Sequence, residues 1–589
     1  MKMRRFIRLL SCTLLLAAVV SGCRSEATTV ELSDYLDEYT LDGDATLAFR
    51  RAVEECRRTG ASRLVIPQGT YHLYPQRAFE KYAYVSNNSA GLKRFLFDLS
   101  GMDDFTVDGQ GARLILHGYI SPFTIDSCRN VTVENLTIDY ARTFHHEGRI
   151  VRAGDGWLDL KFPDYYRYAI RNGDLHFSDD EGNDYPFSHL LEFSTERREP
   201  EFMADDYWLT DNTISAEQQS DGTVRIFKPR LRGRVGNTLL LGPGHRLCPA
   251  FAISDSRGVL LRDITIHHCG GMGVVAQRSG DVELNRVFIE TEEGSDRVIS
   301  ITADATHFSH CDGYVRMIDC RFFNQVDDAT NIHGMYGIVK NILAPDRILV
   351  FFPHEQQYGL DVIRAGEPVE MLHHNSLVTY DEIGVRSVVR LNKEWYEVSF
   401  DRDISDQAVI GDLITEMRYP EVLIKGCRMG NNRARGLLLG SRKRTVVEDC
   451  YFHTPGSPIY FEGDGYYWYE QAGVRDVVIR NNVFDNCNYG KYGCHACIAT
   501  GSGPREERSA SMYNRNIVIE NNTFRVFDPR IMNLYSVDGC TFRNNRLVRN
   551  NDYAYIFGPA EAFVTTDCAN IEIGEWASVS EEHAEKTIE

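Results

Sequence analysis

Short runs of alternating apolar and polar residues recur along this chain, and most of them lead into an Asn or a Cys. Each copy has an apolar residue, two intervening residues, Asn or Cys, one more residue and a second apolar residue. Alternation over such short runs predicts β-strands. The copies are Met317…Cys320…Phe322, Ile424…Cys427…Met429, Val447…Cys450…Phe452, Ile479…Asn482…Phe484, Ile519…Asn522…Phe524 and Val537…Cys540…Phe542, with weaker copies beginning at Val133 and Leu261.

The copies are unevenly spaced, with separations of 23, 32 and 40 residues after Ile424. A solenoid accepts such variation, because each coil stacks on the previous one and insertions leave as loops. Residues 44–53 have the periodicity of an amphipathic helix, and residues 64–71 read as a strand and a tight turn. A helix there would shield the first coil. The pattern predicts an all-β fold, a right-handed parallel β-helix (a pectate-lyase-like solenoid) with an N-terminal cap helix.

Two long segments interrupt the repeat and contain strand-like runs of their own, so we expect two inserted antiparallel β modules with a barrel-like form. The second follows the coil that contains Asp327 and Asp328, and we expect it to form a wall of the site described below. The predicted division is 1–22 signal peptide, 23–145 cap and first coils, 146–246 first inserted module, 247–336 central coils, 337–418 second inserted module, 419–570 C-terminal coils and 571–589 tail.

Asn and Cys exchange at one position of the repeat. Small side chains on stacked turns can form internal ladders, which suits both residue types. We therefore interpret Cys320, Cys427, Cys450 and Cys540 as ladder thiols rather than disulfides or metal ligands. The stretch from Cys494 to Cys497 resembles half of a zinc site, but no second half has the right spacing. It is read as a loop, and a disulfide to Cys487 is left open.

The first residues have the form of an export signal. A basic start is followed by an apolar run that is too short to span a membrane, and then by Val-Ser-Gly before Cys23. This is a lipoprotein box, so we expect a lipid on Cys23 and a membrane partner through that anchor. The expected location is the cell envelope of a Gram-negative bacterium, at the outer membrane or cell surface.

The charge of the chain limits the kinds of ligand that we expect it to bind. The formal net charge is −20 and basic residues form no concentrated patch, which excludes nucleic acid as the expected ligand. Acidity also argues against a polyanionic substrate. No cofactor is predicted, and the oligomeric state is left open.

Three aspartates are the candidate catalytic residues. The stretch from Asp304 is repeated 24 residues later from Asp328, which Asp327 precedes. A repeat of that length suits one coil, so the three carboxylates should form one patch. They follow the apolar runs 298–301 and 322–326, which places them after equivalent strands. Clustered carboxylates suit glycosidic bond cleavage, since one donates a proton while another activates water or attacks. Like charges this close require one carboxyl to keep its proton near neutral pH.

Several residues nearby are candidates for substrate binding. His307, Asn331 and His333 lie close to the aspartates in sequence, and the loop 460–470 combines adjacent aromatic residues with acids. Aromatic faces stack on pyranose rings, and carboxylates accept hydrogen bonds from sugar hydroxyls. A calcium site on the aspartates is an alternative, but no metal is predicted. From the loop we select Glu462, Asp464 and Trp468.

These features together resemble glycoside hydrolase family 110. The resemblance covers most of the chain after the export signal and includes IPQGTY at 66–71, QVDDATNIHG at 325–334 and NRARGL at 432–437. It implies an exo-acting, inverting α-1,3-galactosidase that releases terminal galactose from glycans such as blood group B antigen. It also implies that Asp304 is the proton donor and that the base comes from Asp327 or Asp328. Arg435, within the third stretch, is counted with the substrate-binding candidates.

Three other functions compete with this interpretation. A polygalacturonase-like hydrolase or lyase would need basic residues for uronate carboxylates, for which Arg435 and Arg442 are the candidates. A non-catalytic glycan-binding protein would bind sugar without turnover. A structural solenoid would leave the aspartates as turn residues.

Overall fold

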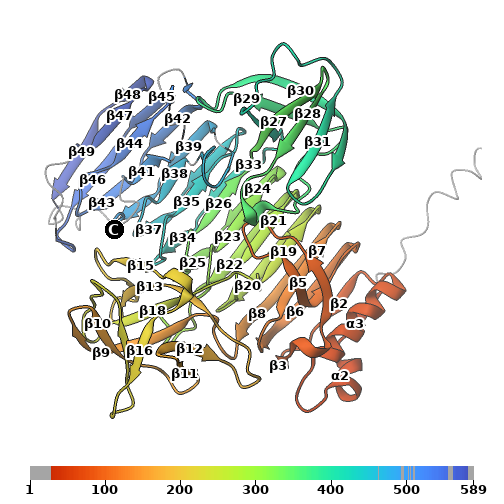
Figure 1. The fold of residues 1–589 in the computed structure, drawn as a ribbon, viewed down its shortest axis with the longest axis vertical. Helices are drawn as coiled ribbons and strands as arrows, with labels where there is room; N and C mark the ends of the chain where they lie inside the picture. The colour runs from red at the N-terminus through yellow and green to blue at the C-terminus, as the bar shows by residue number, and fades with distance from the viewer. Residues whose placement is uncertain are drawn as a thin grey trace, which may run out of the picture.

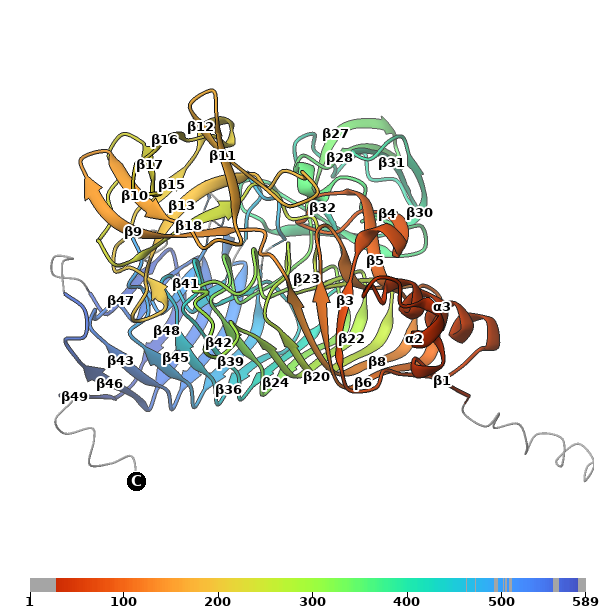
Figure 2. The ribbon, with the colours of Figure 1, turned by 90° about the horizontal axis from the view of Figure 1, so that it is seen from below.

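The computed structural model describes residues 28–580, apart from 462, 472, 492–495, 502, 504–505, 508–510 and 555–560. The described chain is an elongated parallel β-helix that carries two β modules (Figure 1). Both modules project from the same side of the β-helix (Figure 2). This arrangement confirms the predicted solenoid with inserted modules.

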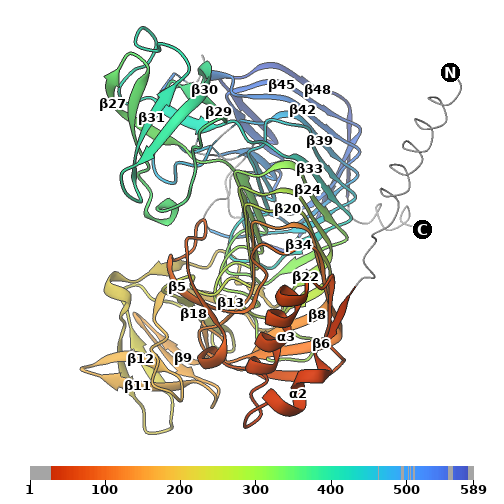
Figure 3. The same cartoon turned by 90° about the vertical axis from the view of Figure 1, so that its right-hand side faces the viewer.

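Two helices lie at the N-terminal end of the solenoid (Figure 3), α2 (Ser33–Tyr39) and α3 (Thr46–Thr59). The buried face of α3 includes Phe49 and Val53, which pack in the same hydrophobic cluster as the first coils. The helix ends at Gly60, whose φ of 68° gives a left-handed C-cap that glycine adopts readily. The predicted cap helix is therefore present. None of the described helices is long and apolar enough to cross a membrane.

Two of the faces of the β-helix belong to a continuous 21-stranded sheet, in which strands of successive coils pair in parallel. Its strands are β1 (Thr29–Glu31), β2 (Arg63–Val65), β3 (Thr70–Leu73), β6 (Asp103–Leu116), β8 (Arg129–Tyr140), β20 (Arg257–Ile266), β22 (Gly280–Ile289), β24 (Asp312–Ile318), β25 (Arg321–Phe323), β33 (Glu421–Lys425), β34 (Arg428–Gly430), β36 (Thr445–Glu448), β37 (Tyr451–His453), β39 (Arg475–Arg480), β40 (Val483–Asp485), β42 (Asn514–Glu520), β43 (Thr523–Val526), β45 (Val537–Arg543), β46 (Asn545–Arg549), β48 (Ala569–Ile573) and β49 (Trp576–Ser580).

A 12-stranded sheet forms the remaining face and carries the candidate site. Thr306 pairs with Thr330 in it, so the 24-residue repeat is one coil, as predicted. Its strands are β4 (Phe79–Ala83), β5 (Gly91–Asp98), β7 (Ser121–Asp126), β19 (Phe251–Ser254), β21 (Val274–Gln277), β23 (Thr306–Ser309), β26 (Thr330–His333), β35 (Leu437–Leu439), β38 (Ile459–Phe461), β41 (Ile498–Thr500), β44 (Met532–Tyr535) and β47 (Phe563–Thr566).

The inserted modules leave the pairing of the coils intact. Val133 pairs with Leu261 across the first insertion, and Met317 pairs with Ile424 across the second. The first module contains β9 (His146–Gly154), β10 (Trp157–Lys161), β11 (Arg167–Arg171), β12 (Asp174–Ser178), β13 (Phe187–Ser194), β14 (Glu199–Pro200), β15 (Asp206–Trp208), β16 (Ser215–Gln218), β17 (Val224–Phe227) and β18 (Thr238–Pro243). The second is a closed barrel of β27 (Gly337–Ala344), β28 (Arg347–Phe351), β29 (Pro368–Leu372), β30 (Thr379–Arg390), β31 (Trp395–Phe400) and β32 (Leu413–Glu416).

The internal ladder of the β-helix begins with thiols and continues with amides. Cys320, Cys427 and Cys450 occupy one stacked position, and each is a free, buried thiol, as predicted. Cys487 and Cys497 are also free thiols, whereas Cys494 and Cys23 lie outside the described residues. The ladder continues as Asn482, Asn522 and Asn545. The backbone N–H of Asn482 donates to Asn522 Oδ1 and that of Asn522 donates to Asn545 Oδ1, both at 2.9 Å.

The prediction that Cys540 belongs to this ladder is wrong. Cys540 lies inside β45 and pairs with Ile517 and Ile571. The ladder position of that coil is Asn545, five residues later. The spacing Val537…Cys540…Phe542 matches the repeat only by coincidence, because the strand pairing sets the register and the short motif does not.

Candidate active site

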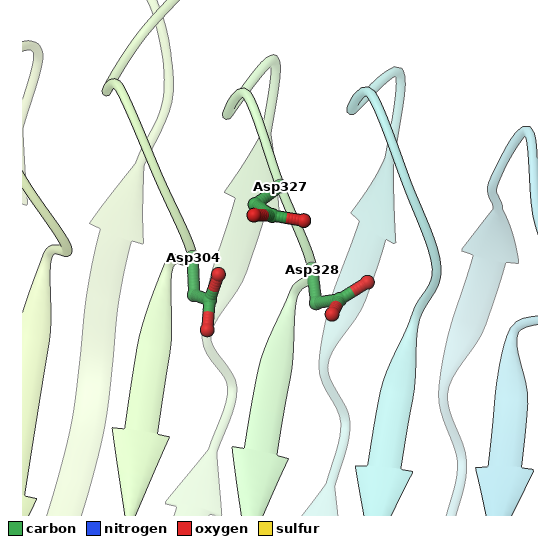
Figure 4. A group of neighbouring side chains, drawn as sticks. All are labelled: Asp304, Asp327 and Asp328. Atoms are coloured by element: carbon green, nitrogen blue, oxygen red, sulfur yellow. The ribbon is translucent and has the colours of Figure 1, made fainter. Parts of the chain in front are cut away.

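The three aspartates lie at a corner of the β-helix, close to the beginning of two neighbouring strands. One alanine separates Asp304 from the start of β23 and Asp328 from the start of β26, and Asp327 comes immediately before Asp328. Figure 4 shows Asp304 and Asp328 at equivalent places on adjacent coils, with Asp327 beside them. The predicted register is therefore correct.

The prediction that Asp304 follows a strand at 298–301 is wrong, since those residues form no strand. Val298 and Ile299 are buried in a cluster with residues of the first module. Their backbone N–H groups donate to Glu147 of β9 at 3.0 and 3.1 Å. The alternation at this point therefore reflects packing under the inserted module.

The carboxylates line a cavity of about 400 Å³. The first module supplies one side of it through Leu191, Asp206 and Trp208, and Trp208 is 60% exposed. Coils on either side of the aspartates complete the cavity. Their lining residues include Asn87, Arg246, Arg433, Tyr460, Trp468, Glu470 and Lys491.

The expectation that the second module forms a wall is wrong, because no residue of that barrel lines the cavity within the described chain. The barrel supports two lining loops from behind. Gln357 Nε2 donates to the carbonyl of Trp468 at 2.7 Å, and the Asn87 N–H donates to the carbonyl of Gln356 at 3.2 Å. The His354 ring also packs on Trp468 with centroids 4.6 Å apart.

Arginines balance two of the three carboxylates. One oxygen from each of Asp304, Asp327 and Asp328 lies within 4.8 Å of the others. Arg246 Nη2 donates to Asp327 Oδ2 at 2.5 Å. Arg435 donates to Asp328 through its backbone N–H at 2.8 Å, Nε at 3.1 Å and Nη2 at 2.9 Å. These carboxylate oxygens are thus turned toward guanidinium groups, an arrangement that does not suit a shared cation.

The three carboxyls differ in pKa. Burial, together with repulsion from Asp327, raises the pKa of Asp304 to about 8. Burial also raises the pKa of Asp328 to about 7, against the lowering effect of Arg435. Burial acts to raise the pKa of Asp327 as well, but Arg246, Arg433 and Arg435 hold it below its ordinary value. Near neutral pH the site therefore contains a neutral Asp304 beside an ionised Asp327.

Two predicted binding residues, His307 and Asn331, line the cavity, whereas His333 lies behind them. His307 Nδ1 is 2.9 Å from Asp304 Oδ2, and His333 Nε2 is 2.8 Å from His307 Nε2. Burial lowers the pKa of His307 to about 3, which keeps the imidazole neutral. Asn331 Nδ2 donates to Glu470 at 3.1 Å.

The other predicted binding residues separate into three groups. Trp468 and Arg435 line the cavity. Asp464 does not; it accepts hydrogen bonds from the N–H groups of Tyr466, Tyr467 and Trp468 at 2.7 to 3.0 Å and so shapes the loop. Glu462 lies outside the described residues.

The charged lining residues that were not selected from the sequence are Glu201, Asp206, Arg246, Arg433, Glu470 and Lys491. Glu470 ends the aromatic loop, and that position was the signal for it. Arg433 lies beside Arg435 in the stretch 432–437, and that stretch was the signal for it. Asp206 and Arg246 have no local signal, because only the folded chain brings them to the cavity. Arg433 pairs with Asp206 through Nε at 2.8 Å, which joins the first module to the C-terminal coils.

This chain is similar in sequence to known protein families and to several named proteins. Family profiles match residues 146–239 as GLAA-B beta-barrel domain I, 347–414 as GLAA-B beta-barrel domain II and 400–575 as a right handed beta helix region. A protein of Shewanella woodyi named alpha-1,3-galactosidase A is 33% identical, with 94% of this chain and 92% of that protein covered. The alpha-1,3-galactosidase A of Bacteroides fragilis is 29% identical over 96% and 94%. The alpha-1,3-galactosidase B of Bacteroides thetaiotaomicron is 28% identical over 97% and 94%.

Proposed function

This chain belongs to the family of the α-1,3-galactosidases and is a glycosidase, and on that premise we propose that it removes terminal α-1,3-linked galactose from glycans such as blood group B antigen. The observation that carries the proposal is the set of three carboxylates in a walled cavity of about 400 Å³. The resemblance to glycoside hydrolase family 110 supports the same assignment.

An exo mode of action follows from the way the cavity is closed. Asn87 Nδ2 donates to Glu470 Oε1 at 3.0 Å, so the loop before β5 meets the loop after β38 across the cavity. Residues of the first module stand on another side. A cavity walled in this way takes the end of a glycan chain more readily than its middle.

We assign the proton donor to Asp304 and the base to Asp327 or Asp328. A general acid must hold its proton at the working pH, and the raised pKa of Asp304 meets that requirement. In the assigned reaction, Asp304 gives its proton to the glycosidic oxygen as the bond to the anomeric carbon breaks. The base takes a proton from the attacking water.

Inversion of configuration is part of the proposal and rests on the resemblance alone. Inverting enzymes ordinarily separate their two carboxyl groups by roughly 6.5–9.5 Å and retaining enzymes by about 5–5.5 Å. One oxygen from each aspartate here lies within 4.8 Å of the others, so retention of configuration is the alternative that this geometry favours. With inversion, Asp327 and Asp328 would hold one water jointly in a compact site. Proton NMR should show β-galactose as the first product, and α-galactose as the first product would overturn inversion.

The alternative of a uronate substrate has less support from the cavity. Arg246, Arg433 and Arg435 line it, but each forms an ion pair with an aspartate. Arg442 lines a different cavity, and its Nη1 pairs with Glu370. A uronate carboxylate would have to displace one of these pairs.

The decisive experiment measures galactose release from blood group B trisaccharide by the wild type and by Asp304→Asn, Asp327→Asn and Asp328→Asn. We expect rapid release by the wild type and a loss of at least about 10²-fold in each variant. Asp319→Asn is the matched control, since Asp319 is exposed at a corner outside the cavity. A folded wild type that releases no galactose, or that cleaves polygalacturonate instead, would reject the function.

Aryl α-galactosides with good leaving groups test the assigned roles. A variant that lacks the proton donor keeps much of its rate on such substrates, because the leaving group needs no proton. We expect Asp304→Asn to behave in this way, and azide to restore activity to the variant that lacks the base. If instead Asp327→Asn keeps its activity on the aryl substrate, Asp327 is the proton donor. Asp304 and Asp328 are then the residues that bind and deprotonate the attacking water.

A lipid anchor on Cys23 completes the proposal and would place the enzyme at the cell envelope of a Gram-negative bacterium. The lipoprotein box supports it. Cys23→Ser should move the enzyme from the membrane fraction to the soluble fraction of expressing cells, and continued membrane association of that variant would contradict the anchor.

A further inference from the structure

A continuous line of hydrogen bonds runs inward from Asp304. Its carboxyl Oδ2 lies 2.9 Å from His307 Nδ1, and His307 Nε2 lies 2.8 Å from His333 Nε2. His333 Nδ1 lies 2.6 Å from the carbonyl oxygen of Gly334. The three side chains are between 0% and 5% exposed, so protons in this line are shielded from solvent.

The partners at the inner end fix how protons are distributed along the line. The Gly334 carbonyl only accepts, so His333 carries a proton on Nδ1. One further proton must lie between the two Nε2 atoms, since two bare lone pairs at 2.8 Å would repel each other. If His307 holds that proton, its Nδ1 is bare and Asp304 must be the donor in the 2.9 Å contact.

The second distribution has the same number of protons. If His333 holds the shared proton, it becomes an imidazolium. His307 then carries its own proton on Nδ1 and donates it to an ionised Asp304. Glu470 Oε1 lies 3.6 Å from His333 Nε2, where a carboxylate stabilises an imidazolium. Burial acts to raise the pKa of Glu470, but the two imidazoles hold that pKa below its ordinary value.

We propose that His307 and His333 form a proton relay that takes the proton of Asp304 inward and returns it. As the relay shifts, the Asp304 O–H bond breaks while the His307 Nδ1–H bond forms, and the His307 Nε2–H bond breaks while the His333 Nε2–H bond forms. No proton enters or leaves. The products are the Asp304 carboxylate and an imidazolium at His333 that faces Glu470. The inference rests on the proposed function and deepens it, because it adds two positioning residues behind the carboxylates.

The relay has a consequence for each turnover. Once Asp304 has given up its proton, the line is one proton short, and two lone pairs face each other at either 2.8 or 2.9 Å. That repulsion ends when a proton returns to the line. The inner end of the line supplies no proton, so the returning proton comes from the base or from water in the cavity, and the relay favours its return to Asp304 before the next substrate is cleaved.

Other charged groups surround the relay from neighbouring elements. Repulsion from Asp327 favours a proton on Asp304, whereas the arginines disfavour it. His310 lies close to His333, but its ring is directed away from Asp304, because its Nε2 accepts from the Met335 N–H at 3.3 Å. The groups that face Asp304 and the two imidazoles are Asp327, Asp328, Glu470, Arg246, Arg435 and His310.

His333→Gln tests the relay. The glutamine oxygen can still accept from His307 Nε2, but it cannot take up the proton. We expect kcat on blood group B trisaccharide to fall by about 10²-fold with KM little changed. We also expect the basic limb of the pH–rate profile to move to lower pH by about one unit. The dependence of kcat on the fraction of D₂O should be curved for the wild type and linear for the variant.

His310→Gln is the matched control, because His310 is also buried and lies only three residues after His307, just past the end of β23. It should keep the wild-type basic limb and the curved isotope dependence. An active wild type whose profile is the same as that of His333→Gln would overturn the relay and leave the galactosidase assignment standing.

A second measurement does not depend on turnover. The shared proton between the two rings should give a strongly deshielded imidazole N–H signal in spectra of ¹⁵N-histidine-labelled enzyme. We expect this signal in the wild type and in His310→Gln, and its loss in both His307→Gln and His333→Gln. Its absence from the wild type would overturn the relay even if the enzyme cleaved no galactoside.

Discussion

At the scale of single residues, the site holds one neutral carboxyl and one charged carboxyl within a few ångströms. Asp304 is hydrogen-bonded to the neutral imidazole of His307, whereas Asp327 accepts from the guanidinium of Arg246. Both side chains are largely shielded from water, so the partner decides the charge. This separation of pKa values is what allows an acid and a base to act at the same pH.

The pH dependence of kcat/KM follows from these pKa values. Loss of the Asp304 proton should end activity as the pH rises through about 8. The acidic limb depends on the base. If Asp327 is the base, activity should persist below pH 5, because its pKa is lowered. We expect this broad plateau from initial rates on an α-galactoside.

A narrow profile would reassign the base. The pKa of Asp328 is raised to about 7, so an acidic limb near pH 7 would identify Asp328 as the residue that must be ionised. A plateau that continues beyond pH 9 would contradict the assignment of Asp304 as the donor. Melting curves across the same range serve as the control for folding.

The sequence predicted these three aspartates because a repeat of one coil length brings them into register. It could not predict Arg246 or Glu470 in the same way. Arg246 lies 81 residues before Asp327, and it reaches that carboxylate only after the first module has folded back on the coils. Long-range placement of this kind leaves no local pattern.

At the scale of the elements, the ladder of side chains holds neighbouring coils together from inside. Asn522 Nδ2 donates to the Ile479 carbonyl at 3.0 Å, and its Oδ1 accepts from the Asn482 N–H at 2.9 Å. These amides satisfy backbone groups at the corners, where the strand pairing is interrupted. At the corners, the ladder thus supplies the hydrogen bonds between coils that strand pairing supplies on the faces.

Asn522→Ala should destabilise the C-terminal coils. The substitution leaves the Asn482 N–H and the Ile479 carbonyl buried without partners, which costs about 2–4 kcal/mol. Differential scanning calorimetry should show a transition several degrees lower. Thr541→Ala on β45, a half-buried position outside the ladder, should change stability by less than about 0.5 kcal/mol. Equal effects of the two substitutions would contradict a structural role for the ladder.

The sequence predicted the type of ladder residue but misplaced one rung. Cys320, Cys427 and Cys450 follow strand patterns that the pairing respects, whereas the pattern around Cys540 fits equally well in a shifted register. Only contact with the neighbouring coil distinguishes the two registers. Asn545, and not Cys540, accepts from the Asn522 N–H and therefore occupies the ladder position. Register is therefore the property that single-chain patterns determine least well.

At the scale of the whole molecule, two β modules rise from one side of the solenoid and have different relations to the cavity. The first supplies lining residues such as Trp208. The second holds the loops of Asn87 and Trp468 from behind. The sequence predicted both insertions, since each interrupts the repeat, but their positions around the cavity depend on how each module packs on the coils.

Arg278 of the solenoid anchors the second barrel. Its guanidinium bonds to Glu416 of β32, to Glu367 at 3.1 Å and to the Val362 carbonyl at 3.2 Å. Arg278→Met would leave the buried Glu416 carboxyl and the Val362 carbonyl without this donor, at a cost of about 1–3 kcal/mol for each group. Hydrogen–deuterium exchange of residues 337–418 should rise, and kcat/KM should fall as the supported loops loosen.

Arg286→Met is the control for this prediction. Arg286 pairs with Asp263 on the exposed surface of the coils, where an ion pair contributes about 0–1 kcal/mol. That variant should keep wild-type exchange and activity. If Arg278→Met leaves the hydrogen–deuterium exchange of the barrel unchanged, the contacts of Arg278 do not hold the barrel in place.

The helical cap at one end of the solenoid gives the molecule a direction of assembly. Helix α3 covers the coil nearest the N-terminus, and each later coil pairs with the one before it. Synthesis produces the N-terminal part first, so the closed end is made first and the chain is built onto a single open edge. The cavity, however, needs segments from Asn87 to Lys491. The cavity is thus completed late in synthesis, with only the last C-terminal coils still to be added, and a chain that ends before Lys491 lacks part of its lining.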